Sequence, residues 1–478
     1  MKTLNRREFL RISALTAAAS LAAACDAGVV SAPSGVAAPA TVAPGGATAQ
    51  PIAGSAVSVS DTPVPGALPS RYQEAPALAE RVAAGELPPV EERLPLEPLV
   101  LPPVDAVGQY GGTLRSMKQG EAMNHVHLMA WCENFAKWRN DIPGSGHRPN
   151  LLTAWEWNEA GTAITLHFRK GIRWSDGHPL TVDDWLFWWF DVALDPNIPV
   201  GRQSGTFVGE HDMEVERVDD YTLILSWPVV NPLFLPMISR GVGDRASSWQ
   251  VAPAHYLKQF HYKYNDKYAS NETTDFIDHW SFRDRYTDMP HFGPWLAKEQ
   301  VPGERIILER NPYYWKVDPE GRQLPYIDEV VFRQVATPEL LVLSSIEGDI
   351  DFIMRGYQTK DLPVLKENEP NGDYQIRMWQ QGDGTASGII FHYCYPDQSI
   401  ADLLWNQKFR QAISVAIDRE RINDIACLGL ARIRNHVPLS TGGEFQSERG
   451  QRILKEWETR WTEYDPEQAK AWLDEIGR

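Results

Sequence analysis

Three pairs of carboxylates are the residues whose type and spacing could support catalysis: Asp183-Asp184, Asp219-Asp220, and Asp349 with Asp351. Two neighbouring acids are what a glycoside hydrolase uses as general acid and as base or nucleophile. Each pair also has a structural explanation, because the first falls at an expected helix start, where negative charge is favourable, and the others flank turns. The sequence therefore favours structural roles for these acids and predicts no catalytic residue.

A second candidate for chemistry is the segment from Gly120 to Asn140, which contains His125, His127 and Cys132. An H-x-H spacing with one distant cysteine does not match the ligand spacing of a zinc site. The runs that identify phosphate-binding loops, dinucleotide-binding loops, zinc proteases and serine hydrolases do not occur in the sequence. We therefore expect no enzyme activity, no metal and no cofactor.

Composition narrows the choice of partners. The formal net charge of -17 leaves no basic face for nucleic acid or anionic lipid. Tryptophan is unusually frequent, at 18 residues against 16 tyrosines and 16 phenylalanines. Tryptophan-rich clefts can stack on sugar rings, although core packing explains most such residues.

The elements that would position any site are organised around the stretch from Leu151 to Leu194. Thr162–Phe168 alternates apolar and polar residues and predicts a half-buried strand. Asp176-Gly177 is typical of a turn with positive φ. Thr181 is an expected N-cap, with Asp184 completing a capping box. The residues that follow, WLFWWF, are apolar on nearly every side and predict a buried helix.

This stretch resembles the dipeptide/oligopeptide solute-binding family of ABC importers, the family-5 extracellular binding proteins. That family carries an LA-x-W-x-W run, an F-x-LRKG-x-x-WSDG segment, a P-[LF]-T turn and a helix that opens with acidic residues. Phe168-Arg169 departs from the family's more frequent Leu-Arg. The matching residues are Leu152, Trp155, Trp157, Phe168, Arg169, Lys170, Gly171, Trp174, Ser175, Asp176, Gly177, Pro179, Leu180, Thr181 and Asp184.

Further blocks extend the resemblance from Gly111 to Gly477. They are an opening strand at Gly111–Arg115, a block at His291–Trp315, a strand at Tyr326–Phe332, a helix at Asn406–Asn423 and a last helix at Ala469–Gly477. Phe292 and Trp295 depart from the G-x-GPY pattern that the family commonly shows at the rim of its cleft.

The resemblance implies an α/β, two-lobed fold of the type II periplasmic-binding-protein kind, with an extra subdomain in the first lobe. We expect the first lobe at residues 108–375, with the subdomain at about 121–225. Residues 376–478 are expected to form a partial second lobe, because family members continue with further strands. The acidic residue that anchors peptide ligands in the family would then lie beyond residue 478.

The first 25 residues predict an export signal. Arg6-Arg7 before Phe9-Leu10 is a twin-arginine signature, and the apolar run ends in a lipobox-like LAAAC at Cys25. Lipidation of Cys25 would tether the protein outside the cytoplasm, and cleavage after an alanine, which releases it, is the alternative. Residues 26–107 are expected to be a flexible Ala/Pro-rich linker and an extension over the first lobe.

The resemblance therefore implies a monomeric, lipid-anchored solute-binding subunit of an ABC importer in the cell envelope. It would capture peptides by lobe closure and deliver them to the permease. An oligosaccharide is the alternative ligand, a secreted glycoside hydrolase the alternative class, and nickel complexes or other small solutes stay open. The candidate ligand-binding residues are Phe292, Trp295, Trp379 and Tyr393.

Overall fold

The computed structural model describes residues 68–119, 133–138, 146–199, 205–239, 250–269, 271–281, 287–353, 356–378, 388–435 and 447–477. The predicted export signal with Arg6, Arg7 and Cys25, the linker up to residue 67, and Trp379 lie outside these residues. The same holds for His125, His127 and Cys132. Within the described ranges, no helix is long and apolar enough to cross a membrane.

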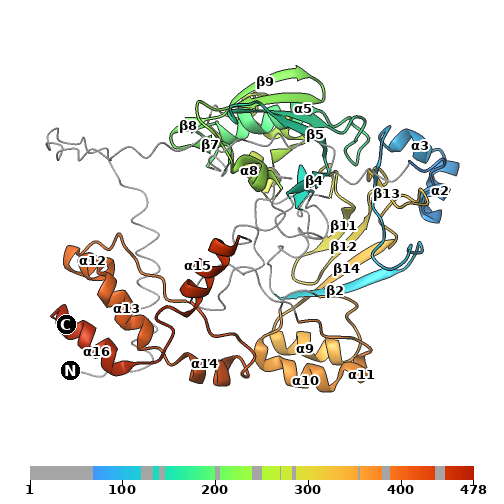
Figure 1. Ribbon diagram of the computed structural model, residues 1–478. Helices are drawn as coiled ribbons and strands as arrows, with labels where there is room; N and C mark the ends of the chain where they lie inside the picture. The colour runs from blue at the N-terminus through green and yellow to red at the C-terminus, as the bar shows by residue number, and fades with distance from the viewer. Residues whose placement is uncertain are drawn as a thin grey trace. The chain divides into compact units, whose positions relative to one another are not determined.

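The first four-stranded sheet is antiparallel and has the strand order β5-β6-β10-β9 (Figure 1). Its strands are β5 (Leu152–Trp157), β6 (Ala163–Phe168), β9 (Glu214–Asp219) and β10 (Thr222–Ser226). Two small hairpins accompany it, β3 (Ala136–Trp138) with β4 (His147–Pro149) and β7 (Phe207–Val208) with β8 (His211–Asp212). The predicted strand at 162–168 is confirmed, because Ile164, Leu166 and Phe168 are buried on one face of β6.

The helix after β6 begins as its capping residues predict. In α5 (Val182–Phe187), Thr181 is the N-cap and forms a capping box with Asp184. The turn before it contains Gly177 with a φ of 86°. The helix then continues as a π-helix, η3 (Trp188–Ala193), a change of winding that the sequence pattern did not predict. Trp185, Trp188 and Trp189 are all buried, which confirms the predicted buried helix.

One large apolar core lies on this sheet. It joins side chains from Phe135 to Trp315 and includes Trp174, Trp227, Trp280 and the tryptophans of α5 and η3. Its other helices are α6 (Phe234–Ile238), α7 (Ala254–Leu257), the 3₁₀ helix η5 (Lys258–Phe260) and α8 (Thr274–Ser281). Most tryptophans in this part of the chain thus pack in the core, as expected for so large an apolar side chain.

The second four-stranded sheet has the order β11-β12-β14-β2. Its strands are β2 (Thr113–Gln119), β11 (Trp295–Val301), β12 (Arg305–Arg310) and β14 (Glu329–Val335), and only the β14–β2 pair is parallel. The helices α9 (Pro338–Ile346), α10 (Leu362–Glu367) and α11 (Glu369–Gly372), with the 3₁₀ helix η7 (Thr359–Asp361), follow β14. Met117 of β2 and Leu341 of α9 share a small core with Ile350, so α9 covers the β2 edge.

Residues 68–101 form α2 (Pro76–Ala83), α3 (Val90–Arg93) and β1 (Leu99–Val100), and β1 pairs in parallel with β13 (Lys316–Val317). Part of the expected linker and extension is therefore regular structure.

Among the residues described after Val335, every regular element is a helix. The last five are α12 (Gln398–Trp405), α13 (Gln407–Val415), α14 (Arg419–Ala426), α15 (Glu448–Thr459) and α16 (Pro466–Glu475). The single helix predicted at 406–423 is wrong in one respect, because α13 ends at Val415 and α14 starts after a new N-cap. Asp418 makes that cap by accepting a hydrogen bond from the Arg421 amide at 2.9 Å.

Candidate functional site

The WSDG turn, which the sequence singles out, is fixed by contacts from distant segments. The Ser175 amide donates to the carbonyl oxygen of His291 at 2.8 Å, and the His291 amide donates to Ser175 Oγ at 3.0 Å. His255 Nε2 lies 2.8 Å from Asp176 Oδ2. A Cβ at Gly177 would lie 2.9 Å from the Tyr313 hydroxyl. This turn therefore holds distant segments together, because its polar groups bind other parts of the protein.

The paired acids also have structural partners. Asp184 is buried and accepts hydrogen bonds from Trp174 Nε1 at 3.0 Å and from the Ala254 amide at 3.1 Å. Burial raises the pKa of Asp184, and these hydrogen bonds oppose that rise. Arg217 binds Asp183 at 2.9 Å and also contacts Asp220.

The third acidic pair is held in the same manner. Asp351 accepts three hydrogen bonds from Arg115, one from the backbone amide at 2.6 Å and two from the guanidinium at 2.6 and 3.1 Å. Hydrogen bonds from Arg115 lower the pKa of Asp351, so this carboxylate is held ionised. Each acidic pair thus contributes to the positioning of a turn or a helix start.

Two of the predicted ligand-binding residues are enclosed. Phe292 packs edge-on against Trp174, with ring centroids 5.4 Å apart, and its carbonyl oxygen accepts a hydrogen bond from Trp315 Nε1 at 3.1 Å. Trp295 opens β11 and belongs to the core of the second sheet. Both side chains are buried, so neither ring offers a face to solvent in this structure.

Tyr393 is the exposed member of the predicted set, and the structure adds Trp405 to it. The two rings lie 4.6 Å apart, and Trp405 Nε1 donates to the Tyr393 carbonyl oxygen at 3.1 Å. Trp405 is 61% exposed and Tyr393 38%. The guanidinium of Arg410 lies 5.6 Å from the Tyr393 ring. Trp405 ends α12, and nothing in its sequence context distinguishes it from the many buried tryptophans.

Arg410 also lines a groove of about 860 Å³. We call it the helical groove, since α13, α14 and the segments 388–391 and 431–435 form it. Its polar lining residues are Gln407, Arg410, Gln411, Ser414, Arg419, Asn423, Arg432, Arg434 and Asn435. Its larger apolar lining residues are Ile389, Phe391, Ile413, Ile417, Ile422, Ile433 and Trp461. None of the described residues that line it is an acid.

Hydrogen bonds hold the polar wall of the helical groove in place. Arg419 donates to Ser414 Oγ and to the Ser414 carbonyl oxygen, both at 2.7 Å, and Ser414 Oγ donates to the Trp461 carbonyl oxygen at 2.8 Å. Burial lowers the pKa of Arg419, while the charge of Glu463 opposes that change. Such a wall of amide and guanidinium donors beside apolar side chains suits a ligand that has hydroxyl or carbonyl oxygens and apolar faces.

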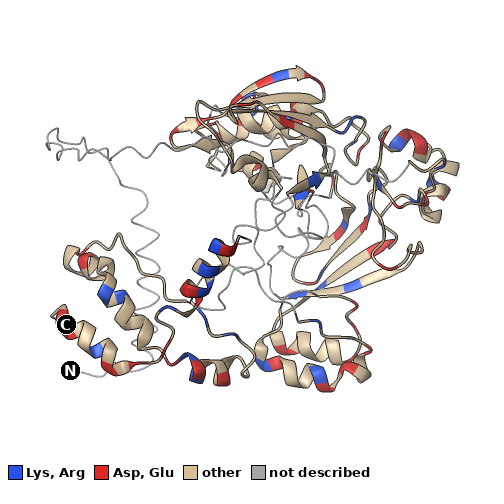
Figure 2. Cartoon of the chain, in the orientation of Figure 1, with Lys and Arg blue, Asp and Glu red and all other residues tan. Residues whose placement is uncertain are grey.

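Two of the arginines that line the groove are paired with one buried carboxylate. Arg432 and Arg434 bind Glu458 of α15 at 2.6 and 3.3 Å, and Glu458 is buried. Figure 2 shows that α15 carries charges of both signs. The buried carboxylate of Glu458 offsets the charge of the two arginines, so the groove is less positive than its arginines alone suggest.

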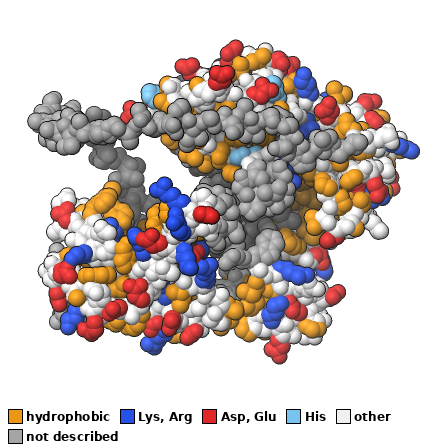
Figure 3. All heavy atoms as spheres, in the orientation of Figure 1, with side chains coloured by type: hydrophobic (Ala, Val, Ile, Leu, Met, Phe, Trp, Pro, Cys, Tyr) orange, Lys and Arg blue, Asp and Glu red, His pale blue; other side chains and the backbone are white. Residues whose placement is uncertain are grey.

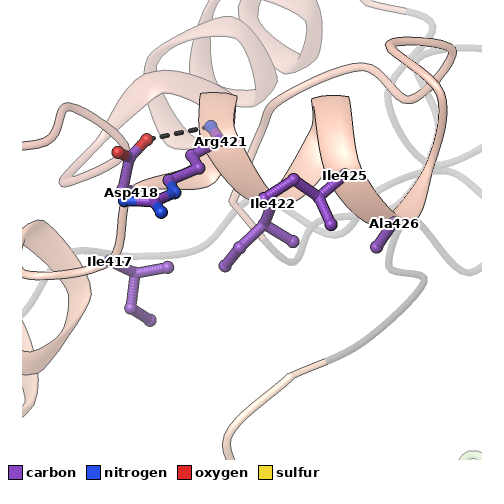
Figure 4. A pocket seen from close by; sticks show the side chains of 6 residues that line it. All are labelled: Ile417, Asp418, Arg421, Ile422, Ile425 and Ala426. Atoms are coloured by element: carbon purple, nitrogen blue, oxygen red, sulfur yellow. Dashed lines mark hydrogen bonds between the residues drawn. The ribbon is translucent and has the colours of Figure 1, made fainter.

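A second hollow of about 420 Å³ lies on α14, where three isoleucines and Ala426 line it together with Asp418 and Arg421 (Figure 4). Ile422 and Ile425 lie side by side there, and Ile425 is 72% exposed. Apolar side chains also interrupt the charged surface elsewhere in the space-filling view (Figure 3). The described residues contain no group of three His, Cys, Asp or Glu side chains that could hold a metal ion.

The described residues form two four-stranded sheets with helices, and surface helices line a groove. The comparison with protein families assigns the class of protein. Residues 147–478 match the model described as bacterial extracellular solute-binding proteins, family 5 Middle. The chain therefore belongs to this family, as its sequence motifs predict.

Individual relatives agree with that assignment. The chain is 27% identical to the periplasmic alpha-galactoside-binding protein of Rhizobium meliloti strain 1021, over 85% of this chain and 60% of the relative. It is 25% identical to the periplasmic oligopeptide-binding protein OppA of Salmonella typhimurium strain LT2, over 70% of this chain and 55% of the relative. These names describe binding proteins, not enzymes.

Solved structures show the same two ligand classes in their names. An oligopeptide-binding protein OppA is 36% identical with a TM-score of 0.64, over 85% of this chain and 64% of that chain. The protein MelB from Agrobacterium fabrum C58, in complex with stachyose, is 29% identical with a TM-score of 0.66, over 85% of this chain and 62% of that chain. The α/β fold of the periplasmic-binding-protein type is thereby confirmed. The chain spans about 60% of the length of these relatives.

Proposed function

We propose that this protein is the solute-binding subunit of an ABC importer, working outside the cytoplasm and passing its ligand to a membrane permease. The family match over residues 147–478 is the observation that carries this proposal. Ligand would favour a closed arrangement of the lobes because it binds that arrangement more tightly, and the permease would recognise the closed form.

The ligand that we propose is an α-galactoside oligosaccharide. The alpha-galactoside-binding relative aligns with 85% of this chain, against 70% for the curated OppA of Salmonella. The exposed pair Tyr393 and Trp405, beside Arg410, is suited to stack on a sugar ring and to donate to its hydroxyl groups. A peptide, the ligand expected from the sequence, is the second candidate, favoured by the OppA structure at 36% identity.

Stachyose should raise the melting temperature of the protein, because a ligand that binds only the folded state stabilises it. At a concentration of 100 times its Kd the gain is about 2.7 kcal/mol. Thermal unfolding with stachyose, with the α-glucoside maltotetraose as a control of equal length, and with tri- to pentapeptides measures the effect. A shift with peptides alone would support the second candidate, and no shift with either class would contradict both. Consumption of stachyose would instead indicate the glycoside hydrolase alternative.

The same experiment tests the aromatic pair. Trp405→Ala should lose most of the stachyose-dependent shift while the melting temperature without ligand changes little, because the ring is exposed. Trp457→Ala is the matched control, since Trp457 is also an exposed tryptophan but lies on α15. If stachyose raised the melting temperature of both variants equally, Trp405 would be excluded from the ligand site.

We also propose export through the twin-arginine route and lipidation of Cys25. Replacing Arg6 and Arg7 by lysine keeps the charge and should leave the precursor in the cytoplasm, as cell fractionation would show. Cys25→Ala should separately abolish labelling with a fatty-acid analogue. Export of the double lysine variant at the normal rate would contradict the twin-arginine assignment, and lipid labelling of the Cys25→Ala variant would contradict the lipobox.

A further inference from the structure

The N-terminal extension is bound to the folded protein by one strand pairing and by three further attachments. We call residues 68–101 the strap; in Figure 1 its helices α2 and α3 lie next to β13. At its carboxyl end, β1 pairs in parallel with β13, Leu99 opposite Lys316 and Val100 opposite Val317. Three strap residues share a small apolar core with the β13 residue, namely Val90, Leu94 and Val100 with Val317.

Arg93 is the central attachment of the strap. Its side chain is 0% exposed, and its guanidinium donates to the Pro312 carbonyl oxygen and, at 3.1 Å, to Gln323 Oε1. Within the strap it donates to the Pro88 carbonyl oxygen at 3.0 Å and pairs with Glu74. Burial lowers the pKa of Arg93, and the charge of Glu74 opposes that change. A buried guanidinium with several partners is costly to uncover, since each group would be left unpaired.

Arg169, from the FRKG motif, makes the second attachment. Its guanidinium donates to the Glu97 carbonyl oxygen of the strap at 2.7 Å and to the Asn150 carbonyl oxygen at 3.2 and 3.3 Å. Gly171 of the same motif lies against Pro95, because a Cβ there would be 3.3 Å from the Pro95 Cα. The strap is therefore bonded both to the turn after β12 and to the segment after β6.

The third attachment is at the amino end of the strap. The Gln73 amide donates to the Gly321 carbonyl oxygen at 2.9 Å, and the Gln323 amide donates to the Gln73 carbonyl oxygen at 2.8 Å. Gly321 has a φ of 83°, and a Cβ at this position would lie 2.1 Å from the Arg71 carbonyl oxygen. Only glycine fits there, because both the backbone conformation and the close approach exclude a side chain.

We propose that the strap is an intramolecular ligand. Residues 312–323 and 169–171 form its binding site, and Arg93 supplies the main anchor. The strap is joined to β2 by the peptide chain, but its side-chain and backbone contacts would hold it in this site without that link. That link runs through residues 102–112, where Val104 is 99% exposed. Gly171, Gly321 and Arg169 of the site support this proposal, because each makes or permits a contact with the strap. One part of the FRKG motif, Arg169, thereby acquires a role that its sequence does not suggest.

The test is to cut the link and ask whether the strap stays. A site-specific protease sequence is inserted after Val104 in the full chain, the purified protein is cleaved, and gel filtration with mass spectrometry follows the N-terminal fragment. We expect the fragment to remain with the body of the protein. In Arg93→Gln it should dissociate faster by about tenfold or more, because several hydrogen bonds to a buried charge are lost.

Arg81→Gln is the matched control, because Arg81 lies on α2 of the strap but is partly exposed and pairs with Glu86 at 3.3 Å. Its fragment should be retained as in the unmodified protein. If Arg93→Gln does not fold, Gly321→Ala replaces it, since the added methyl group would displace the amino end of the strap. Immediate loss of the fragment from the unmodified protein, or equal retention in the Arg93 or Gly321 variant and the control, would overturn the proposal.

Discussion

Lys316→Met is expected to lower the free energy of unfolding by about 3–5 kcal/mol at pH 6, because the buried carboxylate of Glu133 loses the nearer of its two lysines. Burial lowers the pKa of Lys316 to about 7, so the lysine is charged at that pH. Lys316 and Glu133 are both buried, and Lys316 Nζ donates to the two Glu133 oxygens at 2.8 and 2.7 Å. The Tyr314 hydroxyl donates to the same carboxylate at 2.6 Å. Urea unfolding followed by circular dichroism measures the loss.

The effect of Lys316→Met should depend on pH. Burial alone would raise the pKa of Glu133, but the charges of Lys316 and Lys137 and the hydrogen bonds hold it at about 2, against 4.5 for a free side chain. The pKa is lowered on folding, so this stabilisation is present above pH 4.5 and is lost as the pH falls toward 2. In the variant, Glu133 loses the charge and hydrogen bonds of Lys316 that lower its pKa, so protonation of Glu133 should cost the variant less stability than it costs the parent protein. The difference between the two proteins should therefore shrink below pH 4.5.

Lys298→Met is the matched control for this prediction. Lys298 pairs with Glu329 at 3.4 Å, but its side chain is largely exposed, so the change should cost less than about 1 kcal/mol. The buried pair would not be responsible if both variants lost the same free energy of unfolding. The same would follow if the loss in Lys316→Met did not vary with pH.

Trp188→Ala should destabilise the protein by about 3–5 kcal/mol, the range for replacing a buried aromatic side chain by alanine. Trp188 is buried in the large core, with ring centroids 5.6 Å from Trp185 and 5.8 Å from Trp189. Its loss leaves a cavity that the neighbouring rings fill only in part. The midpoint of urea unfolding is the measurement, with the slope as a check that the denatured state is unchanged.

Phe190→Ala provides the comparison within the same π-helix. Phe190 is half-exposed, so its truncation should cost well below the loss at Trp188. A Trp188→Ala variant no less stable than Phe190→Ala would contradict the packing of η3 against the sheet.

Local patterns in the sequence were sufficient for several elements. The alternation in 162–168 and the capping box of Thr181 and Asp184 both appear in the structure. Each depends on residues that are close in the sequence, so hydrogen bonding and side-chain alternation determine them locally. The family motifs were equally reliable, since a long specific match identifies a fold as a whole.

Long-range contacts were not predictable in the same way. Lys316 directly follows the matched block His291–Trp315, and its partner Glu133 is far away in the sequence. The helical groove combines residues from 388 to 461, and Trp405 differs from the core tryptophans only in its exposure. The boundaries of the lobes at 108–375 and 376–478, and the ligand roles of Phe292, Trp295, Trp379 and Tyr393, stay predictions.

The strap also determines how a mechanical load would enter the molecule. A pull on the chain before residue 68 meets the hydrogen bonds between Gln73 and the 321–323 turn first, and then Arg93. Beyond the strap the next strand is β2, which among the described residues lies at the edge of its sheet and pairs with β14. The strap contacts take the load before β2 does, so a protein that is pulled at its amino end would keep β2 paired with β14.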